Sequence, residues 1–164
     1  MKTLEELFTD LLQDVYYAEN AILKALPKMA KTSKSPELSR LFTDHLEETK
    51  GQVARLEQVF EMIDMKPKGK KCHAIEGLIK EAEDVMEDAT DAAVRHAGML
   101  ADAQAVEHYE MARYGALIAW AKQLKLPGAG KLLEQTLVEE KAADQKLSKL
   151  ASSLNEAAGK MDRS

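Results

Sequence analysis

The sequence predicts an all-α protein in which four long helices form a bundle and a shorter fifth helix lies in a long crossover. Three observations support this fold class. The 164 residues include only four prolines, eight glycines and 5% aromatic residues, which is typical of helical domains. Apolar residues recur at spacings of three and four along most of the chain. The clearest breaks separate segments that are long enough to be helices. One domain is expected over residues 1–158, followed by a polar tail over 159–164.

The first helix is predicted over residues 4–31. Thr3 is the expected N-cap, and Glu6 lies three residues later, which together form a capping box before a periodic apolar run. Pro27 falls inside this run and is expected to kink the helix or loosen its last turn. Residues 32–35 read as a short polar connection.

The second helix is predicted to begin at Pro36 and to continue to about Ile63. Ser35 before it is the expected N-cap, and Glu37 places an acid in the first turn. The basic segment 66–71 (KPKGKK) is the strongest break in the chain. Residues 74–87 then predict a shorter helix that lies within the crossover.

The third long helix is predicted over residues 91–124, and the Pro127-Gly128 pair marks the turn that follows it. A last helix carries a leucine-rich stripe to about Leu154, ahead of the polar tail. Short connections therefore join helices one to two and three to four, while a crossover joins the two hairpins. This is the connectivity of a ferritin-like four-helix bundle.

Charge and cysteine content indicate which partners and which cellular compartment to expect. The formal net charge of −5 does not favour a nucleic-acid partner. The single cysteine, Cys72, cannot form an internal disulfide, which favours a reducing compartment. The N-terminal segment lacks the apolar stretch of a signal peptide, and no run approaches ~20 apolar residues. We therefore expect a cytoplasmic protein with no membrane partner.

Each long helix places a glutamate on the apolar stripe that should face the bundle core: Glu19, Glu48, Glu107 and Glu140. A carboxylate that faces a dry interior costs several kcal/mol unless it is neutralised, paired or bound to a cation. One such residue can arise by accident of patterning, but four suggest a site. The simplest occupant is a pair of metal ions held by oxygen ligands.

The positions of the turns predict the height of each acid. Glu19 precedes the first connection by about as many residues as Glu48 follows it, so antiparallel pairing puts both at one level. The same argument brings the acids of the second hairpin together to within roughly one helical turn. The predicted metal ligands are Glu19, Glu48, Glu107, Glu110, Glu140 and Asp144.

Histidine is scarce in this predicted layer. The Glu-x-x-His motif that is usual in dinuclear bundles is absent after both Glu48 and Glu140. His45 lies three residues before Glu48, and Gln52 lies four after it. Either side chain is a candidate neutral ligand or a hydrogen-bond partner of a ligand. The pattern thus favours metal binding more strongly than catalysis.

Other interpretations of these residues stay open. Each acid, taken alone, is also explained as an ordinary helix residue in a chain with 28 Asp and Glu. Tyr114, on the inward stripe, can hydrogen-bond a ligand carboxylate or simply pack in the core. His96 and His108 are expected at the surface or an interface. Cys72 is expected as a turn residue with a partly buried thiol.

Five segments in order along the chain also carry a family resemblance: 18–19 (AE), 45–49 (HLEET), 71–79 (KCHAIEGLI), 106–110 (VEHYE) and 139–144 (EEKAAD). They resemble the YciF-like proteins, which are bacterial stress-associated members of the ferritin-like superfamily. The resemblance implies a homodimer of five-helix subunits that bind two metal ions. Iron is the expected metal, and manganese and zinc are the alternatives. By similarity to rubrerythrin-like di-iron proteins, the five glutamates match acidic ligand positions, while Asp144 stands where a histidine is expected.

These observations lead to one functional interpretation and two alternatives. The interpretation is a stress-response protein whose dinuclear centre handles iron, with ferrous ions oxidised by dioxygen or peroxide. The first alternative is a non-enzymatic dimeric scaffold without a redox metal. The second is a metal buffer that holds iron, manganese or zinc without turnover.

Overall fold

The structure is a computed structural model that describes residues 1–160, and every described element is a helix. The helices are α1 (Leu4–Thr32), α2 (Pro36–Met62), α3 (His73–Asp88), α4 (Ala92–Gln123) and α5 (Pro127–Gly159). Their bounds confirm the predicted segments to within a few residues, except that α5 extends through the start of the predicted tail. Residues 161–164 of that tail lie outside the described part of the chain.

Local capping explains where the helices begin. The Thr3 hydroxyl accepts a hydrogen bond from the backbone N–H of Glu6 at 3.1 Å, and Ser35 caps α2 in the same way. Asp91 caps α4 by accepting from two backbone N–H groups. Each of these contacts satisfies a donor that has no partner within its own helix. Pro27 does not end α1, which continues to Thr32.

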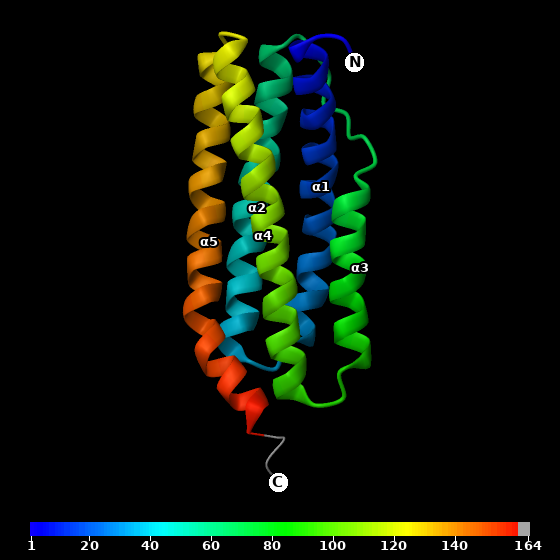
Figure 1. Ribbon diagram of the computed structural model, residues 1–164, viewed down its shortest axis with the longest axis vertical. Helices are drawn as coiled ribbons and strands as arrows, with labels where there is room; N and C mark the ends of the chain where they lie inside the picture. The colour runs from blue at the N-terminus through cyan, green and yellow to red at the C-terminus, as the bar shows by residue number, and fades with distance from the viewer. Residues whose placement is uncertain (161–164) are drawn as a thin grey trace.

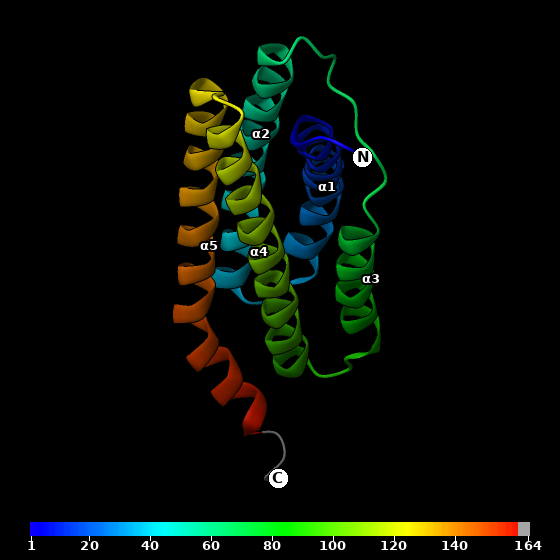
Figure 2. The ribbon, with the colours of Figure 1, turned by 45° about the horizontal axis from the view of Figure 1, so that its top comes forward.

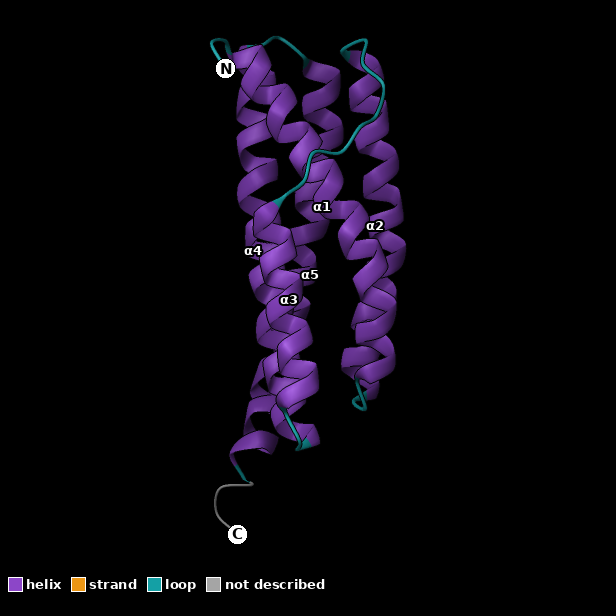
Figure 3. Ribbon diagram, turned by 90° about the vertical axis from the view of Figure 1, so that its right-hand side faces the viewer, coloured by secondary structure: helices purple, strands orange, loops and turns teal. Residues whose placement is uncertain are grey.

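The two hairpins α1–α2 and α4–α5 run side by side as an antiparallel bundle (Figure 1). The crossover leaves the end of α2, passes down the outer side of α1 and leads into α3, which lies against α1 and α4 (Figures 2 and 3). The backbone N–H of Lys70 donates to the Gln13 carbonyl at 3.0 Å and fixes this segment. A Cβ atom at Gly69 would lie 3.2 Å from Tyr17 Cβ, so the close approach favours glycine.

Two apolar clusters fill the bundle, one toward each end. The upper cluster, near the start of α1, contains Phe8, Leu12, Leu56, Phe60, Leu117 and Leu133. The lower cluster, which α3 covers, contains Ile22, Leu26, Phe42, Met86, Met99 and Leu147. Buried glutamates fall between these clusters on α1, α4 and α5, and His45 and Gln52 do so on α2. The inward stripes predicted from periodicity therefore form the core, and its middle is polar.

Two expectations about single residues need revision or refinement. His96 was expected at the surface or an interface, but it is buried, and its Nε2 accepts a hydrogen bond from the Lys34 backbone N–H at 2.9 Å. The α1–α2 connection requires such an acceptor, which helix periodicity does not reveal. Cys72 is fully buried and caps α3 through its sulfur. Among the described residues, no helix is long and apolar enough to cross a membrane.

Candidate metal centre

Four buried glutamates and one histidine form the polar middle of the bundle. Glu19 comes from α1, Glu107 and Glu110 come from α4, Glu140 comes from α5, and His45 comes from α2. All four helices of the bundle thus contribute one or two side chains. None of the glutamates is more than 3% exposed, which is unusual for this residue type.

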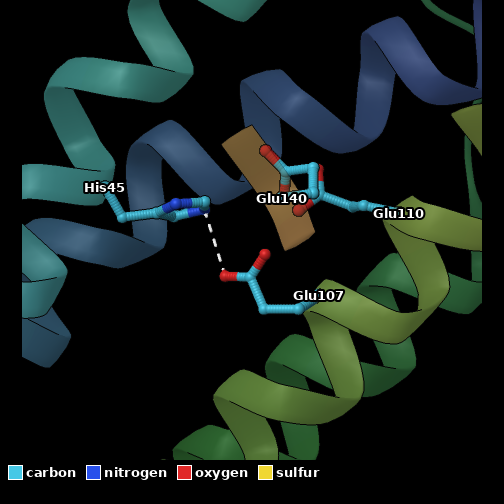
Figure 4. Close-up of side chains that lie close together, drawn as sticks. All are labelled: His45, Glu107, Glu110 and Glu140. Atoms are coloured by element: carbon cyan, nitrogen blue, oxygen red, sulfur yellow. Dashed lines mark ion pairs between the residues drawn. The ribbon is translucent and has the colours of Figure 1, made fainter. Parts of the chain in front are cut away.

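The ligand atoms of this group lie close together. One atom each from His45, Glu107, Glu110 and Glu140 lies within 4.8 Å of every other (Figure 4). His45 Nε2 is 3.6 Å from a carboxylate oxygen of Glu107. Since Glu107 and Glu110 are three residues apart, they share one face of α4 and point toward α5 and α2 together. The geometry gives a compact set of oxygen donors with one imidazole.

Much of the hydrogen-bonding capacity in this group is unused by the described residues. The buried side-chain atoms without a hydrogen-bond partner include Glu19 Oε2, Glu107 Oε2, both carboxylate oxygens of Glu110, Glu140 Oε2 and both nitrogens of His45. Buried polar groups are normally paired, and leaving them unpaired is costly. Converging oxygen atoms with free lone pairs match the donors that hard cations take. The residues present therefore fit a metal centre.

The electrostatics of the group point the same way. Burial, reinforced by Glu140, raises the pKa of Glu107 to about 11 and that of Glu19 to about 8. Burial and the same neighbour raise the pKa of Glu110 well above its ordinary value. Without a cation these carboxyls hold protons at neutral pH, because several negative charges cannot share a dry site. A divalent cation would replace those protons.

Neighbouring side chains orient the carboxylates. The Tyr114 hydroxyl donates to Glu19, which is one of the two roles considered for this tyrosine from sequence. Gln52 donates through its amide nitrogen to Glu140, and also to Glu139 at 3.2 Å. Gln52 thus lies beside the predicted ligands and supports one of them. Its own carbonyl oxygen has no hydrogen-bond partner among the described atoms.

A second layer of contacts was not predicted from sequence. Arg55 pairs with Glu139, and its Nε donates to the Thr136 hydroxyl at 3.0 Å. This cluster joins α2 to α5 just outside the Gln52–Glu140 contact. Helix spacing offered a signal, because Arg55 follows Gln52 by three residues and Thr136 precedes Glu140 by four.

Two of the six predicted acidic ligands lie at the rim of the centre. The Glu48 side chain is 32% exposed, with Oε2 3.8 Å from His45 Nδ1 and Oε1 3.4 Å from Lys146 Nζ. His45 lowers the pKa of Glu48 against the opposing effect of partial burial. Asp144 accepts from Gln104 at 3.2 Å. Neither acid belongs to the four-residue group defined by the 4.8 Å distance, and the buried Glu19 also lies outside that group.

The exposed His108 contacts Asp144 at 3.5 Å, in line with its expected surface position. The rim acids are partly exposed and each has a basic or imidazole neighbour. The inner acids are buried against one another, and His45 is the imidazole beside Glu107. The sequence placed all six in one layer, and the structure divides that layer into an inner and an outer part.

Comparisons with known proteins identify the family. The family described as "Domain of unknown function (DUF892)" matches residues 3–159. Protein YciF of Escherichia coli strain K12 is 49% identical over 152 residues, covering 92% of each chain. The chain belongs to the YciF-like family. The segments that carried the resemblance in the sequence thus pointed to the correct relatives.

Solved structures support the fold of this YciF-like chain. The crystal structure of the E. coli stress protein YciF superposes with a TM-score of 0.91 at 48% identity, covering 95% of this chain and 99% of that one. YcfI from Rhodopseudomonas palustris, described as a proposed structural protein, gives 0.88 at 50% identity, covering 90% and 94%. A Xanthomonas campestris protein at 21% identity gives 0.76, covering 98% and 99%, and shares the fold. The predicted all-α bundle is confirmed.

Proposed function

We propose that this YciF-like protein binds two metal ions in the polar middle of its bundle, and that iron is the preferred metal. One observation carries the proposal: the buried carboxylates of Glu107, Glu110 and Glu140 converge beside the His45 imidazole, and most of their oxygens have no hydrogen-bond partner among the described residues. Apolar side chains in these positions would cost the folded state less free energy than buried carboxylates do. A cation offsets the cost of burying these groups.

The position of each residue indicates its role in binding the ions. Glu107, Glu110, Glu140 and His45 would hold the ions, with Glu19 as a further carboxylate. Binding would require the carboxyls to release the protons that burial makes them hold. Bound iron would supply one-electron chemistry toward dioxygen or peroxide.

The supporting side chains would fix the ligands in place. Gln52 and Tyr114 each donate to one carboxylate and would keep it turned toward the centre. Glu48 would orient His45 from outside the centre. Asp144 would lie at the rim and would not bind the ions directly. An oxygen-rich set with one imidazole suits iron or manganese better than zinc.

The physiological role that we propose is iron handling during stress, in a homodimer. The E. coli relative is described as a stress protein, which supports this role. The description of the R. palustris relative as a proposed structural protein favours a scaffold as the second candidate. A metal buffer without turnover is the third, and the scarcity of imidazole ligands favours it over an oxidase.

Anaerobic ferrous titration of the full-length protein tests the proposal. We expect two ions per chain in the wild type and a loss of stoichiometric binding in Glu140→Gln, with Glu134→Gln as the matched control because Glu134 is exposed on the same helix. Glu48→Ala is expected to weaken binding less than Glu140→Gln does. Undiminished binding in Glu140→Gln would refute the site.

Exposure of the loaded protein to dioxygen or peroxide separates the three roles. Repeated formation of ferric product supports oxidation, and stable ferrous binding without oxidation supports the buffer. Failure of the wild type to bind iron, manganese or zinc would support the scaffold. Analytical ultracentrifugation of the same sample tests the dimer.

A further inference from the structure

One side-chain amide links the outer contacts between α2 and α5 to the candidate metal centre. Gln52 on α2 is fully buried, and its Nε2 donates to Glu140, one of the four residues drawn in Figure 4. The same nitrogen donates to the neighbouring Glu139 at 3.2 Å. The Gln52 carbonyl oxygen has no hydrogen-bond partner among the described residues. The amide therefore uses its donors on two carboxylates of α5 and leaves its acceptor free.

A second side chain of α2 holds Glu139 in place. Arg55 forms an ion pair with Glu139 through Nη2, and its Nε donates to the Thr136 hydroxyl at 3.0 Å. Two donors on different partners fix the plane of the guanidinium. The Arg55 side chain is 18% exposed and Thr136 is buried, so solvent and salt screen this pair less than a surface pair. Glu139 is thus held where its carboxylate also reaches the Gln52 amide.

The orientation of the Gln52 amide depends on this arrangement. A half-turn about the last side-chain bond would exchange the amide nitrogen and oxygen. The reversed amide would place its carbonyl oxygen against the carboxylates of Glu139 and Glu140, which leaves acceptors facing acceptors and is costly. If Glu139 were absent, only Glu140 would oppose the reversal. A cation at Glu140 would then favour it, because a carbonyl oxygen is a ligand for hard cations.

We propose that Arg55 and Glu139 are positioning residues, which hold the Gln52 amide with its N–H group toward Glu140. Gln52 then serves as the hydrogen-bond partner of a ligand, one of its two candidate roles, and not as an oxygen ligand. Arg55 acts only through Glu139. The effect on bound metal rests on the proposed function, whereas the orientation of the amide is measurable in the metal-free protein.

Hydrogen exchange of the Gln52 side-chain amide, followed by NMR on the full-length, metal-free protein, tests the orientation. Gln52→Leu identifies the signal by its loss. We expect Arg55→Gln and Glu139→Ala each to speed the exchange at least about tenfold, because either change takes the Glu139 carboxylate away from the amide. Glu139 is only partly buried, so Glu139→Ala keeps the test decisive if Arg55→Gln does not fold.

Lys50→Gln provides the matched control. Lys50 also lies on α2 and pairs with Glu47 at 2.6 Å, but both side chains are more than half exposed. The substitution removes one positive charge from the same helix and should leave exchange of the Gln52 amide unchanged. Wild-type exchange rates in both Arg55→Gln and Glu139→Ala would overturn the proposal, as would an equal acceleration in Lys50→Gln.

Reversing the ion pair separates positioning from a purely structural role. In the double variant Arg55→Glu with Glu139→Arg, α2 and α5 keep an ion pair, so the midpoint of thermal denaturation should return toward that of the wild type. The group beside Gln52 is then a donor, which favours the reversed amide, so the Gln52 amide signals should stay away from their wild-type positions. Recovery of both the midpoint and the wild-type amide signals would overturn the proposal, because the pair would then act only as a link between helices.

Cobalt titration of the same variants keeps this inference separate from the proposed function. Co²⁺ lies beside Fe²⁺ in the order of metal affinities, and its visible absorption reports the ligands around it. Arg55→Gln and Glu139→Ala should weaken Co²⁺ binding about ten- to hundredfold and change the absorption, while Lys50→Gln should change neither.

The two sets of measurements can fail independently. If the wild type binds neither Co²⁺ nor Fe²⁺ but the amide behaves as expected, the proposed function is removed and the orientation of Gln52 stands. Normal metal binding together with unaltered amide exchange in Arg55→Gln and Glu139→Ala would remove this inference alone.

Discussion

The upper and lower halves of the bundle are built differently, although the same helices run through both. In the upper half, aromatic side chains fill the space: the rings of Tyr16 and Phe60 pack edge to face with centroids 5.5 Å apart. In the lower half, methionine and alanine side chains are among those that surround a pocket. The upper end of the bundle is therefore closely packed, whereas the lower end leaves a cavity beside the polar layer.

The covering helix contributes to this contrast. The upper half closes without α3, through the four bundle helices and connecting residues such as Met65, while the lower half is also covered by α3 against α1 and α4 (Figure 2). Close packing of a core normally leaves few voids. The lower half departs from that rule at an apolar pocket whose lining includes Phe42 and Met86 as well as His45 and Glu107.

Truncating one aromatic residue in each half should produce the largest effect and measures the contrast directly. Phe60→Ala removes a fully buried ring from the filled upper cluster and should lower the free energy of unfolding by about 3–5 kcal/mol. Phe42→Ala, whose ring lines the pocket, should cost about half as much because fewer contacts are lost. Urea denaturation of both variants gives the two values, and equal costs would remove the distinction between the halves.

The polar layer between the halves should make metal-free stability depend on pH. The folded pKa values of Glu19 and Glu107 lie at about 8 and about 11, above the ordinary value near 4.5. Below pH 4.5 both states are protonated, so no penalty applies. As pH rises toward 8, only the unfolded chain loses protons, so the free energy of unfolding should fall by about 1.4 kcal/mol per pH unit for each of the two carboxyls.

Denaturation of metal-free protein between pH 5 and pH 8 checks this slope. Glu107→Gln should flatten it, since an amide cannot ionise, and Glu134→Gln should leave it unchanged. Metal binding should release protons into the buffer, which calorimetry in buffers of different ionisation enthalpy detects. A slope of opposite sign would show that the inner carboxyls are ionised in the folded state.

Removing a single hydroxyl should give the smallest effect. Tyr114→Phe deletes the buried donor to Glu19 and should cost about 1 kcal/mol. Tyr16→Phe deletes a partly exposed donor to Glu57 in the same cluster and should cost less. Thermal denaturation compares them. If the two substitutions have equal effects, the Tyr114 contact does not support the polar layer.

Local sequence patterns predicted the fold because helix starts depend on neighbouring residues. Thr3, Ser35 and Asp91 each cap the helix that begins directly after them. The inner glutamates were also predictable, because an acid in an apolar stripe stands out against a period of 3.6 residues.

Contacts between distant segments were not predictable in this way. Which acids reach the interior depends on how each helix is rotated, and successive residues differ by about 100°. Glu48 and Asp144 therefore fall at the rim although they fit the same stripe. The pairing of Arg55 with Glu139 depends on the docking of α2 on α5. The pocket has no sequence pattern at all, since it arises where packing is incomplete.

The location of the buried acids midway along the bundle has a consequence for cooperativity. The two apolar clusters are separated by this polar layer. Protonated carboxyls contribute little stabilising contact between the clusters. In the metal-free state the lower half can open while the upper half persists, and hydrogen exchange would then report two levels of protection. A cation bound by α1, α2, α4 and α5 at once would couple both halves into a single unfolding unit.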